Sequence, residues 1–201
     1  MSSKAYKPKD HFFKKAHAEG LRARSAFKIE EIARRFSIFK KGQTVLDLGA
    51  APGGFLQIIL AEVGPNGTVV GVDLVPIRSL GKANVKTAVL DVHASDFDQK
   101  LLELHPGRFD VVASDLAPKT TGIHTVDEAR SLGLAGKALQ ISQARGKARG
   151  HFIAKLFMGG GFEEFRDQIR LVYEEVKIVR PEATRQASKE VYLVGLRRRG
   201  S

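Results

Sequence analysis

The segment "TVLDLGAAPGG" (residues 44–54) decides the fold. Its first half has the branched apolar side chains of a buried strand, and its second half is a turn of small residues. An apolar helical pattern follows over residues 53–63. Small residues let a backbone approach a ligand closely, and the helix after them presents free N–H groups. The segment therefore predicts a strand, a ligand-binding turn and a helix in succession.

The rest of the chain repeats the alternation of strand and helix, without internal repeats. We predict helices over 10–20, 24–36, 53–63, 95–104, 126–145 and 162–171, and strands over 44–49, 68–74, 85–91, 109–115, 151–157, 173–179 and 190–196. Repeated strand–helix–strand units predict an α/β domain with a parallel sheet and helices on both faces. Ligands of such sheets bind beyond the carboxyl ends of the strands.

Aspartates lie at four of these strand ends: Asp47, Asp73, Asp91 and Asp115. One such acid is often only a helix cap, but four in register indicate a ligand that carries hydroxyls and positive charge. The turn reads G-x-x-P-G-G from Gly49 rather than G-x-G-x-x-G, which disfavours a nicotinamide dinucleotide. S-adenosylmethionine, with its ribose hydroxyls, adenine amine, ammonium and sulfonium, fits this ring of carboxylates.

A lysine interrupts the driest strand, "HFIAKLF" (151–157). Lysine is almost never buried without a partner. If the last strand is antiparallel to the others, Asp115 and Glu190 both come near the Lys155 ammonium, and paired charges lose less on leaving water. Lys28, in contrast, fits the polar face of its own helix, and taken alone it is expected to be solvated.

The composition excludes several kinds of site and reaction. The 201 residues contain no cysteine, which excludes disulfides, thiolate metal sites, iron–sulfur clusters and cysteine nucleophiles. Carbon-5 methylation of pyrimidines usually needs such a nucleophile, and "SDLAPK" (114–119) is not the loop used to methylate exocyclic amines. A hydroxyl acceptor needs a cation to orient it and to stabilise the developing alkoxide. Lys155 can supply that cation.

The net charge of +11 is concentrated at the ends of the chain. Residues 1–41 hold 12 Lys/Arg against 4 Asp/Glu, residues 197–199 are all arginine, and the stretch between them is neutral. These ends are either solubilising or a phosphate-binding surface, and the phenylalanines among the N-terminal charges favour the second interpretation. The sequence shows neither a membrane-spanning run nor the apolar core of a signal peptide, so we expect a cytoplasmic protein.

The chain resembles the FtsJ family of ribose 2'-O-methyltransferases in blocks that keep their order from about residue 10 to residue 196. The blocks are "RARSAFKIEEI", "VLDLGAAPGG", "GVDLVPI", "SDLAPKTTG", "FIAKLFMGGGF" and "SKEVYLV". The resemblance implies a Rossmann-like class I S-adenosylmethionine-dependent methyltransferase fold, a mostly parallel seven-stranded sheet with an antiparallel last strand. It also implies methylation of a uridine in 23S ribosomal RNA within the large ribosomal subunit.

The resemblance also implies roles for individual residues. The catalytic set falls on Lys28, Asp115, Lys155 and Glu190, which reverses the expectation of a solvated Lys28. The expected cofactor-binding residues, from the resemblance and the turn together, are Asp47, Gly49, Pro52, Gly53, Gly54, Phe55, Asp73, Asp91 and Asp115. Members often carry Trp at the position of Phe55, so a hydrogen bond from an indole N–H is lost here. No metal is required.

The expected organisation is one domain and a monomer. Residues 1–41 form a basic helical extension that docks RNA, residues 42–196 the catalytic core and residues 197–201 a basic tail. Two alternatives remain: methylation of another RNA, such as a transfer RNA or cap ribose, and a non-catalytic RNA-binding ribosome assembly factor. The segment "QARGKARGHF" (143–152) departs from the family's expected turn by adding three cations.

Overall fold

The computed structural model describes residues 11–200. The helices are α1 His11–Ala18, α2 Ala26–Phe36, α3 Gly54–Val63, α4 Phe97–Leu104, α5 His124–Arg145 and α6 Phe162–Val172. The strands are β1 Thr44–Leu48, β2 Thr68–Asp73, β3 Val85–Val89, β4 Phe109–Ser114, β5 Gly146–Phe157, β6 Tyr173–Val179 and β7 Glu190–Arg198. Each predicted element is present; the predictions for residues 1–10 and 201, including the start of the first helix, lie outside the described residues.

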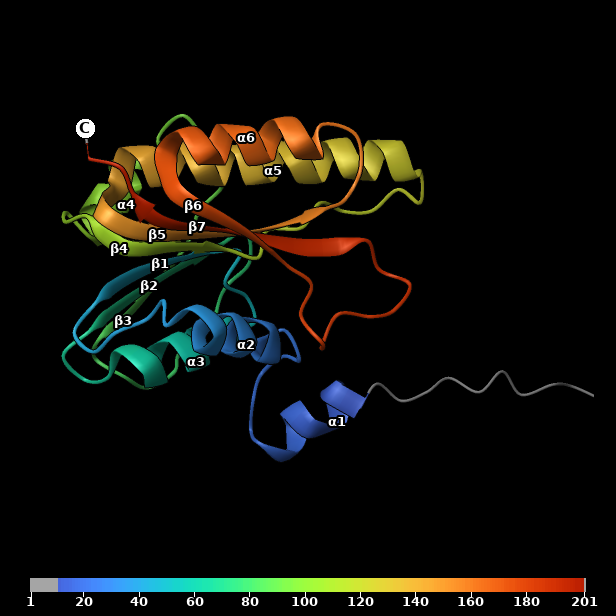
Figure 1. Cartoon of the computed structure of the whole chain (residues 1–201). Coiled ribbons are helices and arrows are strands. Elements are labelled where there is room, and N and C mark those ends of the chain that lie inside the picture. The colour runs from blue at the N-terminus through green and yellow to red at the C-terminus, as the bar shows by residue number, and fades with distance from the viewer. Residues whose placement is uncertain (1–10, 201) are drawn as a thin grey trace, which may run out of the picture.

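The strands form one sheet in the order β3-β2-β1-β4-β5-β7-β6. Strands β1 to β5 pair in parallel, whereas β7 is antiparallel to both of its neighbours, β5 and β6 (Figure 1). The predicted mostly parallel seven-stranded sheet with an antiparallel last strand is confirmed. The chain leaves β1 toward β2 and β3, then returns to β4 on the other side of β1. The carboxyl ends of β1 and β4 therefore mark the topological switch point, where ligands of such sheets bind.

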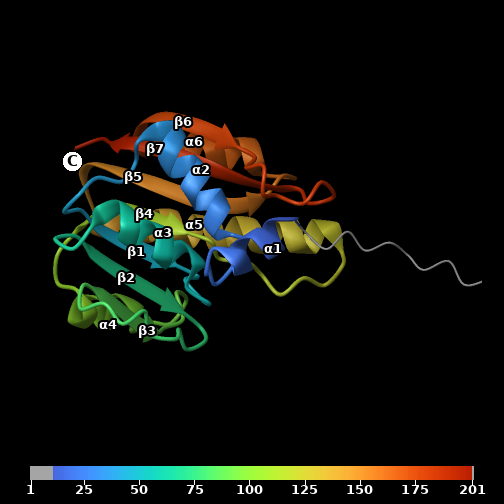
Figure 2. The same ribbon diagram turned by 90° about the horizontal axis from the view of Figure 1, so that it is seen from below.

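Helices cover both faces of the sheet. Figures 1 and 2 show α2 and α3 on one face and α4, α5 and α6 on the other. The apolar stripe of α2, which includes Ile29 and Ile32, packs with Leu56 and Ile59 of α3 against Val45 and its neighbours in the sheet. Helix α2 therefore forms part of the helical layer on this face of the sheet, and it carries Lys28 to the sheet. Among residues 11–200, no helix combines the length and apolar content needed to cross a bilayer.

Strand β5 begins five residues earlier than predicted. The added segment pairs Gly146 with Phe109, after which the register shifts before regular pairing resumes at His151. Its central residues, Lys147 to Arg149, are exposed and two of them are charged, so the sequence lacks the apolar pattern that reveals a strand.

The segment of residues 143–152, which departs from the family's expected turn, adds three cations, and each of them has a structural partner. Arg145 donates to two backbone carbonyls in the α4–β4 connection, Lys147 lies 2.9 Å from Asp110, and Arg149 lies 3.4 Å from Glu174. All three lie near the amino end of β5, at the edge of the sheet away from the switch point. Lys147 and Arg149 thus offset carboxylates on that side of the molecule, and Arg145 satisfies backbone acceptors there.

The carboxyl-terminal arginines also continue the sheet. Strand β7 extends to Arg198, and Arg197 forms ion pairs with Glu174 and Glu175 of β6. Because β7 is antiparallel, its end lies at the same edge as the amino ends of the parallel strands. This charged cluster therefore lies at the edge of the sheet opposite the switch point.

Candidate active site

Two nearly buried ion pairs lie at the carboxyl edge of the sheet. The Lys155 ammonium lies 3.0 Å from Oδ1 of Asp115, and it also donates to the Asp115 backbone carbonyl at 2.7 Å. The Lys28 ammonium pairs with the Glu190 carboxylate. Both lysine side chains are only 7% exposed. Each buried cation thus has a carboxylate partner, as burial requires.

Strand register explains why these groups meet. Lys155 pairs with Tyr192 across the β5–β7 ladder, and Glu190 lies two residues before Tyr192 on β7. Alternate residues of a strand share a face, so Glu190 and Tyr192 point to the same side as Lys155. That side carries α2, which brings Lys28 to Glu190. The expectation that two carboxylates flank Lys155 is thus corrected: Asp115 contacts Lys155, and Glu190 contacts Lys28.

The expectation of a solvated Lys28, drawn from its helix alone, is wrong. The β6–β7 connection reaches back over this side of α2, where the Glu182 backbone N–H donates to the Glu31 carboxylate at 2.9 Å. A helical pattern shows which face is polar, but it does not show that a distant loop and a strand carboxylate cover part of that face. Lys28, taken as a whole residue, is only 5% exposed as a result.

Sequence reasoning missed Tyr192. Its hydroxyl donates to Oδ1 of Asp115 at 2.7 Å, and its ring centroid lies 6.0 Å from the Lys28 ammonium. Burial raises the pKa of Tyr192 well above its usual value, and the nearby carboxylates of Asp115 and Glu190 add to the rise. Tyr192 therefore remains a protonated donor that fixes the Asp115 carboxylate. Its position two residues after Glu190, on the same face of the strand, is a signal that could have identified it.

A cavity of about 360 Å³ opens at the switch point beside the Lys155–Asp115 pair. Of the predicted site residues, Gly49, Asp73, Asp91, Asp115 and Lys155 line it. Leucines and valines supply apolar walls, including Leu74, Val92, Leu116 and Leu134. The cavity therefore combines convergent carboxylates with apolar surface.

Backbone hydrogen bonds hold two of these carboxylates in place. Asp73 accepts from the N–H groups of Ala51 at 2.9 Å and Val75 at 3.1 Å, and Asp91 accepts from the N–H of His93 at 2.9 Å. Each carboxylate retains unused acceptor capacity, because an ionised carboxylate has about four lone-pair sites. Both are therefore positioned to accept further bonds from hydroxyl or amino groups.

The remaining predicted cofactor residues lie outside this lining. A Cβ on Gly53 would approach Arg22 within 2.9 Å, and one on Gly54 would approach Ala23 within 3.0 Å. These two glycines thus admit the α1–α2 connection beside the turn. Pro52 precedes them, and the Phe55 ring packs 6.4 Å from the ring of Tyr192.

Gly49, which does line the cavity, has a φ of +80°, and a Cβ there would lie 2.9 Å from a backbone nitrogen of the β4–α5 connection.

Asp47 is completely buried on β1, one strand position before Leu48. Neither of its carboxylate oxygens has a hydrogen-bond partner among the described residues. Burial raises the pKa of Asp47 well above its usual value, and the charges of Asp115 and Asp73 raise it further. A buried carboxyl in this environment is stable when it carries a proton or gains a cationic partner.

The fold first defines the class of protein. The strand order with an antiparallel β7, and a ligand cavity at the switch point, are those of a Rossmann-like methyltransferase. The crystal structure of a protein described as a ribosomal RNA methyltransferase from Plasmodium falciparum superposes with a TM-score of 0.79 at 23% identity, covering 90% of this chain and 100% of that one. Aeropyrum pernix fibrillarin, solved with natively bound S-adenosyl-L-methionine, gives a TM-score of 0.60 at 13% identity over 86% of this chain and 76% of that one.

The chain belongs to the FtsJ-like methyltransferase family, whose model matches residues 21–198. It is 66% identical over 196 residues to the ribosomal RNA large subunit methyltransferase E of Myxococcus xanthus, covering 98% of this chain and 92% of that protein. The resemblance seen in the sequence blocks is confirmed.

Proposed function

We propose that this protein methylates a ribose 2'-hydroxyl of RNA, namely that of a uridine in 23S ribosomal RNA within the large ribosomal subunit, with S-adenosylmethionine as the methyl donor. The observation that carries the proposal is the buried Lys155–Asp115 pair, which lies at the wall of the switch-point cavity. The names of its relatives and the family membership support the choice of ribosomal RNA.

The cavity fits the proposed methyl donor. Its volume of about 360 Å³ lies within the range of sites for small ligands. The carboxylates of Asp73 and Asp91 suit ribose hydroxyls and an adenine amino group, and Leu74 and Val92 suit the faces of a flat ring. S-adenosylmethionine, when bound, supplies a methyl group activated on a sulfonium.

Lys155 is the proposed catalytic residue. A ribose hydroxyl has a pKa far above neutrality, so its reaction requires a group that orients the oxygen and offsets the developing negative charge. The Lys155 ammonium can hold the 2'-oxygen and balance the negative charge that develops as this oxygen releases its proton to water and gains the methyl group from the sulfonium. Only after it has given up its own proton can the Lys155 amine instead accept the proton of the hydroxyl. Asp115 fixes Lys155, and the Tyr192 hydroxyl fixes Asp115. Much of the gain in rate can come from this alignment.

The Lys28–Glu190 pair is proposed as the second half of the catalytic set. It lies on the α2 side of Tyr192, where Lys28 supplies a further cation for the RNA and Glu190 limits its movement. We propose that the protein acts as a monomer, because one chain can supply every member of the set. Action on ribosomes would place the protein in the cytoplasm.

The experiment compares Lys155→Ala with Lys147→Ala, an exposed lysine at the opposite edge of the sheet. We expect Lys155→Ala to abolish methyl transfer to large ribosomal subunits while calorimetry shows cofactor affinity close to that of the wild type. Lys147→Ala should retain both. Loss of cofactor binding in Lys155→Ala, or retained methyl transfer, would contradict the assigned role.

A further inference from the structure

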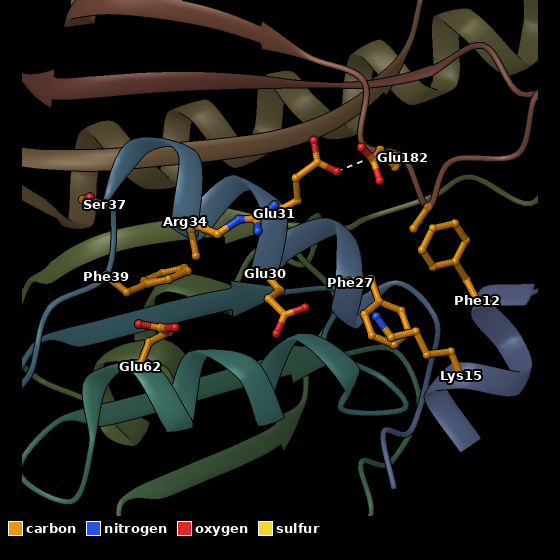
Figure 3. Close-up of a pocket in the computed structure, with 12 residues that line it drawn as sticks. Phe12, Lys15, Phe27, Glu30, Glu31, Arg34, Ser37, Phe39, Glu62 and Glu182 are labelled. Carbon is orange, nitrogen blue, oxygen red and sulfur yellow. Dashed lines mark hydrogen bonds between the residues drawn. The ribbon is translucent and has the colours of Figure 1, made fainter. Parts of the chain in front are cut away.

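Two further cavities flank α1, and both are larger than the one at the switch point. The first, of about 550 Å³, runs between α1, α2, α3 and the β6–β7 connection (Figure 3). Acidic side chains predominate in it: Glu30, Glu31, Glu62 and Glu182 face only Lys15 and Arg34. A polyanion is disfavoured along this groove.

The second cavity, of about 690 Å³, has the opposite charge, and we call it the basic cavity. The aromatic, polar and charged residues that line it are Phe13, Lys14, His17, Arg22, Arg24 and Arg185. No acidic residue of the described chain lines it. The chain is strongly basic at this end, and here the charge gathers around a hollow rather than spreading over a solvated face.

Helix α1 separates the two cavities. Phe12 and Lys15 line the acidic groove, whereas Phe13, Lys14 and His17 line the basic cavity. This division follows from helical geometry, because residues 13 and 17 lie four apart on one side of the helix. The two sides of α1 thus differ in charge, and a nucleic acid strand is favoured on one side only.

The basic cavity lies beside the proposed catalytic set. Arg24 belongs to the segment that leads into α2 and Lys28, and Arg185 belongs to the loop that leads into β7 and Glu190. A strand held between these two segments therefore lies near the parts of the chain that carry Lys28 and Glu190.

The wall of the basic cavity is tied to the cofactor turn. The Arg22 guanidinium donates to the carbonyls of Pro52 at 3.3 Å and Ser79 at 2.7 Å, and its backbone N–H donates to the Gln57 side chain at 2.7 Å. These bonds join the α1–α2 connection to the turn after β1 and to the β2–β3 connection. The position of the wall is thereby fixed relative to the switch-point cavity.

Phe13 stands out in this lining because its side chain is 64% exposed. Nucleic-acid bases stack on exposed aromatic rings, and each stacked base adds to the affinity. Single-stranded segments offer their bases for such stacking, whereas bases inside a duplex are covered. An exposed aromatic ring among cations therefore matches both parts of a single-stranded RNA.

We propose that the basic cavity binds a single-stranded stretch of the RNA substrate next to the target nucleotide, with a base stacked on Phe13 and phosphates near Lys14 and the arginines. This inference rests on the proposed function and assigns a specific docking residue to it. The acidic groove on the other side of α1 disfavours the strand there.

The chain contains no tryptophan, so Phe13→Trp introduces a single fluorescent reporter. We expect a uridine-containing single-stranded RNA oligonucleotide to quench its fluorescence, and a duplex of the same sequence to do so much less. Leu171→Trp is the matched control, because Leu171 is 80% exposed on α6, away from the basic cavity. Its fluorescence should not respond to the RNA.

Phe13→Ala tests the energetic contribution of the ring. It should weaken binding of the oligonucleotide on the order of tenfold, and Phe13→Tyr should restore it. On large ribosomal subunits, Phe13→Ala should raise KM with little change in kcat, while cofactor affinity stays constant.

Absence of quenching in Phe13→Trp, together with unchanged RNA binding by Phe13→Ala, would overturn this inference. A raised KM on subunits without weaker RNA binding would also overturn it, because a protein component of the subunit would then occupy the cavity. Methyl transfer by the wild type to subunits lacking the mark is measured separately. Its absence would reject the proposed function, whereas its presence, with no quenching and with unchanged RNA binding by Phe13→Ala, would reject only the docking role of Phe13.

Discussion

The buried pair between Lys28 and Glu190 allows a quantitative test of the site's architecture. Lys28→Met keeps most of the apolar stem but leaves Glu190, whose side chain is 13% exposed, without its cation. Breaking one side of a buried ion pair costs about 3–5 kcal/mol. Because Glu190 keeps some contact with water, we take the lower end, about 3 kcal/mol. At a urea dependence of about 2–3 kcal/mol per molar, the unfolding midpoint should fall by about 1 M.

The double variant decides whether the loss comes from the pair. Glu190→Gln alone should also destabilise, since it leaves the Lys28 ammonium buried. Lys28→Met/Glu190→Gln should recover most of the loss, with a coupling energy of at least about 2 kcal/mol in urea unfolding at pH 7. Additive losses in the double variant would show that the two side chains do not depend on each other, and would refute the reasoning.

Three further variants test other parts of the site, and a fourth serves as a control. Gly49→Ala should lower cofactor affinity at least about tenfold in calorimetry, since the φ of +80° and the close backbone neighbour oppose a Cβ. Gly136 lies in a helix with no atom near its Cβ position, so the control Gly136→Ala should stabilise the folded protein by about 0.5–1 kcal/mol in urea unfolding. Asp47→Asn should unfold at a higher temperature than the wild type, by a margin that grows with pH above about 4. In that range the folded protein still holds the Asp47 proton that the unfolded chain has released, so the wild type loses stability as pH rises until the raised pKa is passed. Tyr192→Phe removes a 2.7 Å hydrogen bond to Asp115, so it should cost about 1.5–3 kcal/mol in urea unfolding and slow methyl transfer in a turnover assay without weakening cofactor binding.

The sequence predicts the sheet well because its central strands are apolar and are separated by clear helical patterns. It also places Asp73, Asp91 and Asp115 at one edge, since the carboxyl ends of parallel strands lie together. Strand β5 is the exception. Three of its first five residues are exposed, and pairing to Phe109 rather than hydrophobic burial makes this segment a strand.

The limits of sequence reasoning are clearest at the lysines. Lys155 interrupts an apolar strand, so its need for a partner is visible in the sequence itself. Lys28 shows no such conflict on its helix, because its burial depends on Glu190, which lies 162 residues away. Tyr192 resembles an ordinary core residue until the register places it between the two ion pairs. Long-range register and loop coverage, rather than local pattern, determine these contacts.

The most direct test is nucleoside mass spectrometry of large ribosomal subunits that lack the modification, incubated with S-adenosylmethionine and either the wild type or Lys155→Ala. We predict 2'-O-methyluridine in the 23S RNA with the wild type alone. Absence of any new methyl mark with the wild type, while cofactor binding is intact, would contradict the proposed substrate. The same mark formed by Lys155→Ala would contradict the catalytic role of the buried lysine.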